Sequence, residues 1–250
     1  MPNQNPKVSV IVTSYNNEQY IKEALDSVFM QKDIDFEVLL ADDCSTDNSL
    51  LIMKEYVKKH PKISRILNRS KNLGMCLNMY DAYHKVKGEY IAILEGDDFW
   101  IDHLKLKKQA DVLDKKKKYS GVFHYYDVLE DEKRSPHEMQ LKNLVKKKKN
   151  EITMKDLIEK NYIGNLSACM FRAEILKSID KSIFENFFIA DWLTGMLSID
   201  KGGPLFFIKE KMSVYRLHTD SQWTSLGQID RVYQIYQARV LYNYILNYVI

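Results

Sequence analysis

Two adjacent carboxylates, Asp97 and Asp98, directly follow an apolar run in the segment "ILEGDDFW". Like charges side by side repel, so the pair needs an opposing charge nearby. Carboxylates without clustered cysteine or histidine suit a hard cation such as Mg²⁺ or Mn²⁺, which keeps waters and takes phosphate oxygens as further ligands. An acidic surface turn is the alternative interpretation of the same pair.

Two further polar clusters, "TSYNN" and "DDCSTD", also follow short apolar runs. The second is not an EF-hand calcium loop. Counting from Asp43, Asn48 stands where that loop has its invariant glycine, and Lys54 stands where it has its bidentate glutamate. The chain also contains no GxxxxGK[ST] phosphate loop, GxGxxG dinucleotide fingerprint or GxSxG nucleophile elbow.

The elements that must position these clusters alternate between strand and helix through the first half of the chain. We expect strands at 8–14, 36–41, 64–68 and 89–94, and helices at 18–30, 75–86 and from a cap at Asp47 to residue 59. Such spacing predicts parallel βαβ units, whose ligands bind beyond the carboxyl ends of the strands. The three polar clusters should therefore meet at one edge of an α/β sheet.

The second half of the chain is less regular. We expect strands at "GVFHYYDV", "NLSACMFR", "PLFFIK" and "MSVYRL", a helix at "ADWLTGMLSI" and an exposed loop over 130–150. Residues 229–250 predict an amphipathic helix in which Leu241, Ile245 and Val249 share one face. That helix would pack on the core or on a partner, or contact a membrane surface, unless the chain is cut within a longer protein.

The composition is that of a globular protein, with 45% hydrophobic residues and a net charge of +3. The near balance of charge gives no case for a nucleic-acid partner. The lysine runs at 115–118 and 146–149 predict solvated surface, with polyanion or anionic membrane contact as the alternative.

The cysteines and the lack of a long apolar segment indicate in which cellular compartment the protein is found. Cys44, Cys76 and Cys169 lie far apart without a CxxC pair, so the sequence predicts neither a disulfide framework nor a zinc site. The polar start "MPNQNPK" is not a signal peptide, and no run of about 18 apolar residues occurs. We expect a cytoplasmic protein, with the inner face of the cell membrane as a second location.

On these motifs the chain resembles the inverting glycosyltransferases of family 2, of the bacterial surface-glycan type, over roughly residues 7–220. The matching segments are "VSVIVTSYNNEQYIKEALDSVFMQ", "VLLADDCSTDNS", "NLGM" and "KGEYIAILEGDDFW". The resemblance implies a GT-A-like, Rossmann-like fold of three α/β/α layers with a mostly parallel central sheet. It implies one domain over 1–228, with a nucleotide and metal half at about 1–128 and an acceptor half at about 129–228.

The resemblance also implies roles for individual residues. Asp43 corresponds to the carboxylate that accepts a hydrogen bond from uracil, and Asp97 to a ribose or metal contact. Asp98 and His218 would bind the metal, Mn²⁺ or Mg²⁺, and Arg216 the diphosphate. The alternatives are a structural histidine at His218 and a pair between Arg216 and a surface acid. The implied nucleotide-binding set is Thr13, Tyr15, Asn16, Asp43, Asn72 and Asp97.

A catalytic carboxylate follows from the same resemblance. In "FFIADWLTGML" the first acid of the family's usual pair is Ala190, and Asp191 stands at the second. A carboxylate within hydrogen-bond reach of an acceptor hydroxyl can remove its proton as it attacks, which makes Asp191 the expected base. The alternative is a helix N-cap, because Asp191 opens an apolar-periodic segment.

The sequence departs from the family in the loop after "NLG". Many members have an arginine there that reaches the diphosphate or ribose, whereas this chain has Met79, and Arg69, Lys71 or Asn72 would have to compensate. Trp100 is expected either in the acceptor-side wall or in the core.

The expected function is metal-dependent, inverting transfer of a sugar from a nucleotide donor to a glycan or lipid-linked glycan, and the donor is expected to be a UDP-sugar. A nucleotidyltransferase that makes nucleotide sugars is one alternative, but it should have a glycine-rich loop where this chain has "TSYNNEQY". A non-catalytic carbohydrate-binding or assembly module is the other. The retained Asp43, Asp97, Asp98 and Asp191 argue against it, whereas Met79 favours it.

Overall fold

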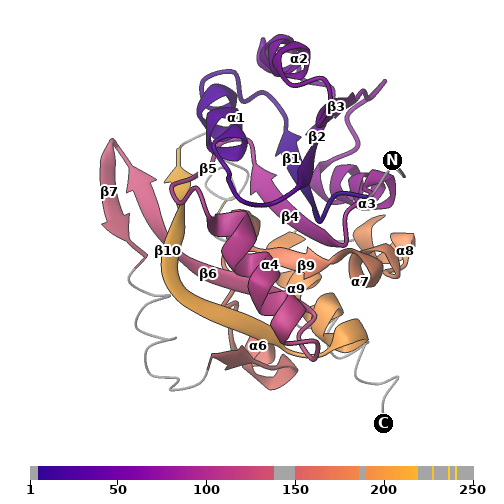
Figure 1. Cartoon of the computed structure of the whole chain (residues 1–250), viewed down its shortest axis with the longest axis vertical. Helices are drawn as coiled ribbons and strands as arrows, with labels where there is room; N and C mark the ends of the chain where they lie inside the picture. Colours follow the sequence, from indigo (N-terminus) through magenta and orange to yellow (C-terminus); the bar gives the residue numbers. More distant parts are fainter. Residues whose placement is uncertain are drawn as a thin grey trace.

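The computed structural model describes residues 5–137, 150–185 and 190–218, together with Gly227, Tyr236 and Val240 (Figure 1). The predicted C-terminal helix, the domain boundary at 228 and the lysine run at 146–149 lie outside the described residues, apart from Tyr236 and Val240.

The first half of the described chain alternates between strand and helix, as predicted. Its order is β1 (Val8–Ser14), α1 (Ile21–Phe29), β2 (Phe36–Asp42), α2 (Ser49–Lys59), β3 (Ser64–Leu67), α3 (Met75–Lys85) and β4 (Tyr90–Glu95). β1 pairs in parallel with β2 and with β4, and β2 pairs in parallel with β3. The carboxyl ends of these strands therefore point to the same edge of the sheet.

The second half extends the same sheet. Its order is β5 (Phe99–Trp100), α4 (Lys105–Lys115), β6 (Gly121–Glu130), β7 (Lys133–Pro136), β8 (Glu151–Ile152), α6 (Met154–Glu159), η1 (Leu166–Ala168), β9 (Met170–Arg172), α7 (Ala173–Lys177), α8 (Lys181–Glu185), α9 (Ala190–Gly202) and β10 (Leu205–Leu217). Within the described residues the strand order is β3-β2-β1-β4-β9-β6-β10-β5, with β7 on β6 and β8 on β10. β9 is antiparallel to both β4 and β6, so it joins the two halves.

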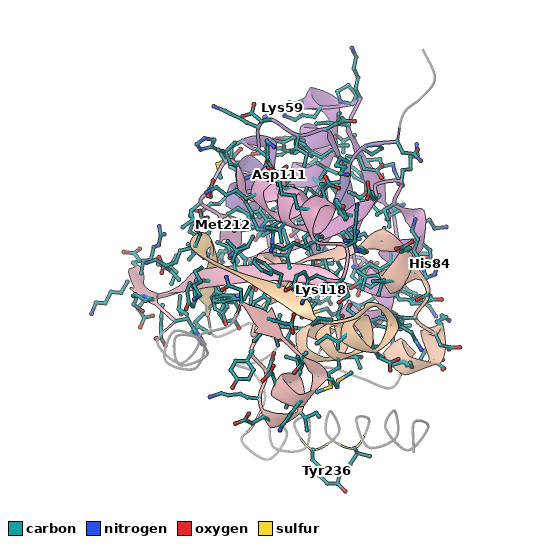
Figure 2. The ribbon with its side chains drawn as sticks, turned by 60° about the horizontal axis from the view of Figure 1, so that its bottom comes forward. Lys59, His84, Asp111, Lys118, Met212 and Tyr236 are labelled. Atoms are coloured by element: carbon teal, nitrogen blue, oxygen red, sulfur yellow. The ribbon has the colours of Figure 1, made fainter. Side chains whose placement is uncertain are left out.

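Two apolar cores lie on opposite faces of the sheet, which gives the three-layer arrangement. Successive side chains of a strand point to opposite faces. Accordingly Ile11 of β1 packs with the side of α3 and α9, whereas Val10 and Val12 pack with the side of α1, α2 and α4. Figure 2 shows side chains filling the space between the sheet and these helices. The predicted mixed α/β class with helices on both faces is confirmed.

Two of the predicted strands are one strand in the structure. The segments "PLFFIK" and "MSVYRL" belong to β10, the long curved strand that runs beside β6 (Figure 1). Glu210 and Lys211 lie between the two predicted strands and are exposed, as is Lys209 before them. The register with β6 shifts between Ile208 and Ser213, so a bulge turns these charges to solvent while the strand continues.

Two other predictions of local structure are wrong. The segment "NLSACMFR" is mostly not a strand: Leu166–Ala168 form the 3₁₀ helix η1, and β9 is short. The predicted loop over 130–150 contains β7, which forms a hairpin with β6. Residues 138–149 of that loop lie outside the described part of the chain.

Candidate active site

The three polar clusters meet at the carboxyl ends of β1, β2 and β4, as predicted. The amide of Gly96, just after β4, donates to the carbonyl of Thr13 in β1 (2.8 Å). The amide of Asp43, just after β2, donates to the carbonyl of Ser14 (2.8 Å). Backbone hydrogen bonds therefore hold the "TSYNN", "DDCSTD" and "EGDD" segments side by side.

The turn after β1 is fixed against the turn after β2. Asn16 adopts a positive φ of 54°, a conformation that asparagine tolerates better than most residues. Its Oδ1 accepts from the amide of Thr46 (2.8 Å), and its own amide donates to the hydroxyl of Ser45 (3.0 Å). Tyr15, beside it, is 46% exposed. The ring is thus available to a ligand at this edge.

The carboxylate of Asp43 is buried and holds the loop that leads into α3. Its Oδ1 accepts from the amide of Leu73 and its Oδ2 from the amide of Gly74, both at 2.8 Å. Asn72 is exposed, and its side chain also accepts from the amide of Gly74 (2.9 Å). Each carboxylate oxygen of Asp43 retains a second lone pair for a ligand.

Asp97 and Asp98 face in opposite directions. Asp98 is only 1% exposed. Its Oδ2 accepts from Asn165 (2.7 Å) and Ser167 (2.6 Å), and its Oδ1 accepts from the amide of Arg216 (2.9 Å). Burial and then the charge of Asp97 raise the pKa of Asp98 to about 7. The geometry therefore favours a structural role for Asp98, not the predicted role of metal ligand.

Asp97 points outward to His218 at the end of β10. Its Oδ2 lies 3.1 Å from Nε2 of His218, and the two side chains are 20% and 14% exposed. The His218 ring packs against Tyr20, with centroids 4.8 Å apart. The structure thus brings together two of the residues predicted at the diphosphate and metal, from positions 121 residues apart.

Arg216 does not present a free guanidinium to this site. Its Nε donates to the carbonyl of Asp97 (2.9 Å), and its Nη2 pairs with Glu23 of α1 (2.5 Å). The guanidinium also lies 4.8 Å from the ring centroid of Tyr20 and 5.4 Å from that of Phe99. Arg216 thus pairs with a surface acid and holds the turn that carries Asp97, and its contact with the diphosphate stays a prediction.

Asp191 lies in the first turn of α9 and is partly buried. Its Oδ2 accepts from Nδ2 of Asn161 (2.9 Å), and its Oδ1 from the amide of Trp192 (2.7 Å). Burial raises the pKa of Asp191, and these two hydrogen bonds oppose that shift. Asp191 is not the N-cap of the predicted alternative, because α9 already begins at Ala190. Its role as the base stays a prediction, and each of its oxygens keeps a second lone pair for a proton.

Asp191 belongs to the same electrostatic cluster as the carboxylates after β4. Burial, and then the charges of Asp98, Asp97 and Asp191, raise the pKa of Glu95. Burial and the charges of all four carboxylates also raise the pKa of Tyr215 in β10. Asp191 and the carboxylates after β4 therefore lie within electrostatic reach of the same two side chains, Glu95 and Tyr215.

Four other residues singled out from the sequence are buried, exposed or paired elsewhere. Met79 is fully buried in the core between α3 and the sheet, so it does not stand in the site in place of an arginine. Arg69 pairs with Asp81 of α3 (2.5 Å), whereas Lys71 is exposed beside Asn72. Trp100 is 1% exposed, so the prediction that it lines the acceptor side is wrong and the alternative, core burial, is right.

Sequence reasoning missed the residues that hold these carboxylates in place. Asn161, Asn165 and Ser167 donate to Asp191 or Asp98. They lie in a stretch interpreted as loop and strand. The one available signal was the pair of asparagines around a glycine in "NYIGN", since asparagine and glycine favour tight turns with fixed side-chain hydrogen bonds.

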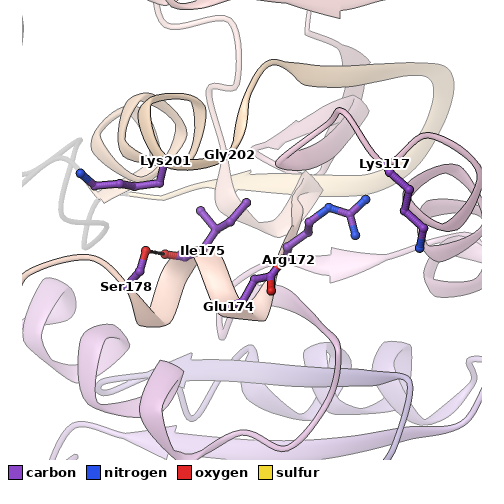
Figure 3. Close-up of a pocket in the computed structure, with 7 residues that line it drawn as sticks. All are labelled: Lys117, Arg172, Glu174, Ile175, Ser178, Lys201 and Gly202. Atoms are coloured by element: carbon purple, nitrogen blue, oxygen red, sulfur yellow. Dashed lines mark hydrogen bonds between the residues drawn. The ribbon is translucent and has the colours of Figure 1, made fainter. Parts of the chain in front are cut away.

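The described residues also bear on a metal and on membranes. They contain no group of three or more His, Cys, Asp or Glu side chains placed to hold a metal ion by themselves. Nor do they contain a helix with the length and apolarity needed to cross a membrane. A polar pocket lies near the opposite edge of the sheet, and it contains no residue of the candidate site (Figure 3). Its lining residues are Lys117, Arg172, Glu174, Ile175, Ser178, Lys201 and Gly202.

The chain belongs to glycosyl transferase family 2, because the model of that family matches residues 9–180, more than half of the sequence. Rv1520 of Mycobacterium tuberculosis, described as an uncharacterized protein, is 32% identical over 219 residues, which cover 87% of this chain and 61% of that protein. The poly(ribitol-phosphate) β-N-acetylglucosaminyltransferase TarS of Staphylococcus aureus is 36% identical over 126 residues, or 49% of this chain and 20% of TarS.

Solved structures show the same fold. The crystal structure of TarS 1–349 in complex with UDP-GlcNAc has a TM-score of 0.69 at 23% identity, over 88% of this chain and 61% of that one. The mannosyltransferase PcManGT from Pyrobaculum calidifontis, in complex with GDP-Man and Mn²⁺, has a TM-score of 0.68 at 19% identity, over 88% and 59%. At these identities the likeness establishes the fold, which is GT-A-like.

Proposed function

We propose that the protein is a metal-dependent, inverting glycosyltransferase that uses a nucleotide-sugar donor. The observation that carries the proposal is the convergence of Asp97, His218 and Asp191 at one sheet edge, in a chain of this family. A single domain over 1–228 would hold the donor in its first half and the acceptor in its second.

The donor would lie across the turns after β1, β2 and β4. Tyr15 offers an exposed ring, Thr13 and Asn16 shape the first turn, and Asp43 offers lone pairs to a base N–H. Asn72 and Lys71 are exposed beside Asp43. The titles of the TarS and PcManGT complexes name UDP-GlcNAc and GDP-Man, which supports a nucleotide sugar as the class of donor. We propose a UDP-sugar, because a uracil N–H suits the carboxylate of Asp43.

The metal would be held by Asp97 and His218, not by Asp98. Their 3.1 Å separation is close to that of two adjacent ligands of an octahedral ion, about 3 Å for metal–ligand distances of about 2.1 Å. A carboxylate suits Mg²⁺ and Mn²⁺, and the imidazole favours Mn²⁺ of the two. The chemistry that such an ion supplies when bound is positive charge at the diphosphate.

Asp191 would act as the general base. Its free lone pairs accept the proton of the acceptor hydroxyl as that oxygen attacks the anomeric carbon and the bond to the diphosphate oxygen breaks. The proton passes to the carboxylate, and the bonding pair leaves with the diphosphate. Burial raises the pKa of Asp191, so the rate should fall as the pH drops through that value and the base is protonated.

The acceptor would be a glycan or a lipid-linked glycan of a bacterial surface polymer. TarS is named for transfer to poly(ribitol-phosphate), which supports a surface polymer as the class of acceptor. Such acceptors are assembled at the membrane. We therefore propose that the protein is cytoplasmic and works at the inner face of the cell membrane.

The test is release of nucleoside diphosphate from a panel of UDP- and GDP-sugars with Mn²⁺, using wild type and Asp191→Asn. We expect hydrolysis of one donor by wild type, and a loss of about a hundredfold or more in the variant. With an acceptor found, NMR of the product should show inversion of the anomeric centre. Retention of configuration, or equal rates in the two proteins, would contradict the proposal.

A further inference from the structure

The segment "NYIGN" over 161–165 links α6 to η1 and reaches Asp191 through Asn161. The orientation of the Asn161 amide follows from its two partners. Its Oδ1 accepts from the backbone amide of Gly164 (3.1 Å), which can only donate. Its Nδ2 must therefore face the other way, toward Oδ2 of Asp191 at 2.9 Å.

We propose that Asn161 is a positioning residue that keeps Asp191 ionised and turned toward the acceptor, so that its carboxylate is ready to take a proton. This inference rests on the proposed function of Asp191 as the base. An amide N–H that points at a carboxylate oxygen stabilises the charged form and opposes protonation of that oxygen.

The two hydrogen bonds to Asp191 leave it in the state that a base needs. Oδ2 accepts from Asn161, and Oδ1 accepts from the amide of Trp192 (2.7 Å). Because each oxygen already accepts one hydrogen bond, the negative charge of the ionised carboxylate is stabilised. One lone pair on each oxygen stays free for the acceptor proton.

No other side chain in the described part of the chain donates a hydrogen bond to Asp191, although several titratable groups face it. They are Glu95 at the end of β4, Cys76 of α3, Tyr126 of β6, Cys169 between η1 and β9, and Tyr215 of β10. When ionised these groups are anionic, so each can only favour the protonated form of Asp191. The opposing contributions come from Asn161 and from the backbone amides of Trp192 and of Asp191 itself.

The same segment also holds the donor side of the site. Nδ2 of Asn165 donates to Oδ2 of Asp98 (2.7 Å), so a five-residue stretch connects the base to the turn that carries Asp97. Gly164 between them has a φ of +68°, and a Cβ there would collide with the hydroxyl of Tyr126. The segment is therefore held in one conformation, and it fixes the base relative to the donor.

The direct test is a pH titration of the Asp191 carboxyl by NMR in protein labelled with ¹³C at aspartate Cγ. Asp191→Asn assigns the signal. Wild type is compared with Asn161→Leu, which removes the donor at nearly constant volume, and with the smaller Asn161→Ala. Asn150→Leu is the matched control, because its part-buried side chain also donates one hydrogen bond, in its case to the backbone carbonyl of Phe207 (2.9 Å), where β8 pairs with β10.

We expect Asp191 to titrate at higher pH in both Asn161 variants and at the wild-type pH in the control. In the donor-hydrolysis assay, the acidic limb of the kcat profile should move to higher pH. On that limb the rate should fall roughly tenfold, as expected for one lost hydrogen bond to a charged group. The rate should recover as the pH rises, whereas a merely structural defect would lower it at every pH.

An unchanged Asp191 titration in both Asn161 variants would overturn the inference, as would an equal shift in the control. The titration needs no turnover, so it separates this inference from the proposed function. If wild type hydrolyses no donor while the titration shifts as expected, then Asn161 tunes Asp191 but the assigned reaction is wrong.

Discussion

Lys105 is a fully buried lysine of α4, and replacing it by methionine should change how stability depends on pH. Its Nζ donates to Oε1 of Gln109 (2.7 Å) and lies 4.1 Å from the ring centroid of Trp100. Burial lowers the pKa of Lys105 from 10.5 to about 7. The unfolded chain therefore binds one more proton than the folded chain between these two pH values, and folded stability rises with pH across that window.

The magnitude follows from the shift. At about pH 7 the burial of Lys105 costs roughly 4 kcal/mol relative to a lysine with an unshifted pKa, and at about pH 9.5 it costs only roughly 1.4 kcal/mol. Wild type should thus gain roughly 3 kcal/mol between these pH values from this residue alone. Lys105→Met leaves Oε1 of Gln109 without its donor, a cost of about 1–3 kcal/mol that does not vary with pH.

The assay is urea denaturation of wild type and Lys105→Met at several pH values. The difference in free energy of unfolding, variant minus wild type, should fall by roughly 3 kcal/mol from about pH 7 to about pH 9.5. Lys107→Met is the matched control on the same helix, because Lys107 is 41% exposed and pairs with Asp111. Parallel curves for wild type and Lys105→Met would refute the reasoning, since they would mean that the buried ammonium carries no shift.

Three further predictions concern the residues that hold the site. Gly164→Ala should lower the free energy of unfolding by about 2–4 kcal/mol in urea denaturation, because φ is +68° and the added Cβ would collide with the hydroxyl of Tyr126. Adding Tyr126→Phe, which removes that hydroxyl, should restore part of the lost free energy of unfolding. Trp100→Ala should cost about 3–5 kcal/mol, and a cost under about 1 kcal/mol would contradict its burial. Arg216→Met should leave the fold intact by circular dichroism and weaken Mn²⁺ binding roughly tenfold, because it frees the carbonyl of Asp97; unchanged affinity would refute that role.

Much of the fold could be predicted because its first half consists of strongly patterned elements. β1 is rich in β-branched residues, and β2 has an aliphatic centre. A helix and polar turns separate the two strands, so both their existence and their parallel pairing follow. The second half was harder because long-range contacts override local pattern. Ser167 is held in a 3₁₀ turn by hydrogen bonds with Glu95 and Asp98, and nothing in "NLSACMFR" signals those partners.

The candidate site could be predicted as a region but not in its detailed geometry. The motif located Asp97 and Asp98 together. The alternation of side chains between the two faces of a strand applies only as far as Glu95, where β4 ends, so the sequence could not show which of the two carboxylates faces inward. The family resemblance assigned Arg216 to the diphosphate. In the structure its guanidinium forms an ion pair with Glu23, which lies 193 residues earlier in α1. The role of Asn161 was not predicted, because it depends on Asp191 thirty residues away.

The most direct test of the central claim, that Asp97 carries the metal of a donor site, is calorimetric binding of UDP with and without Mn²⁺. Wild type, Asp97→Ala and Asp98→Asn are compared, with the fold of each checked by thermal unfolding. We predict that wild type binds UDP only with Mn²⁺, and that Asp97→Ala stays folded but loses this dependence. Asp98→Asn should lose stability instead, because both of its oxygens accept hydrogen bonds in the interior. Metal-dependent UDP binding by Asp97→Ala at wild-type affinity would contradict the account.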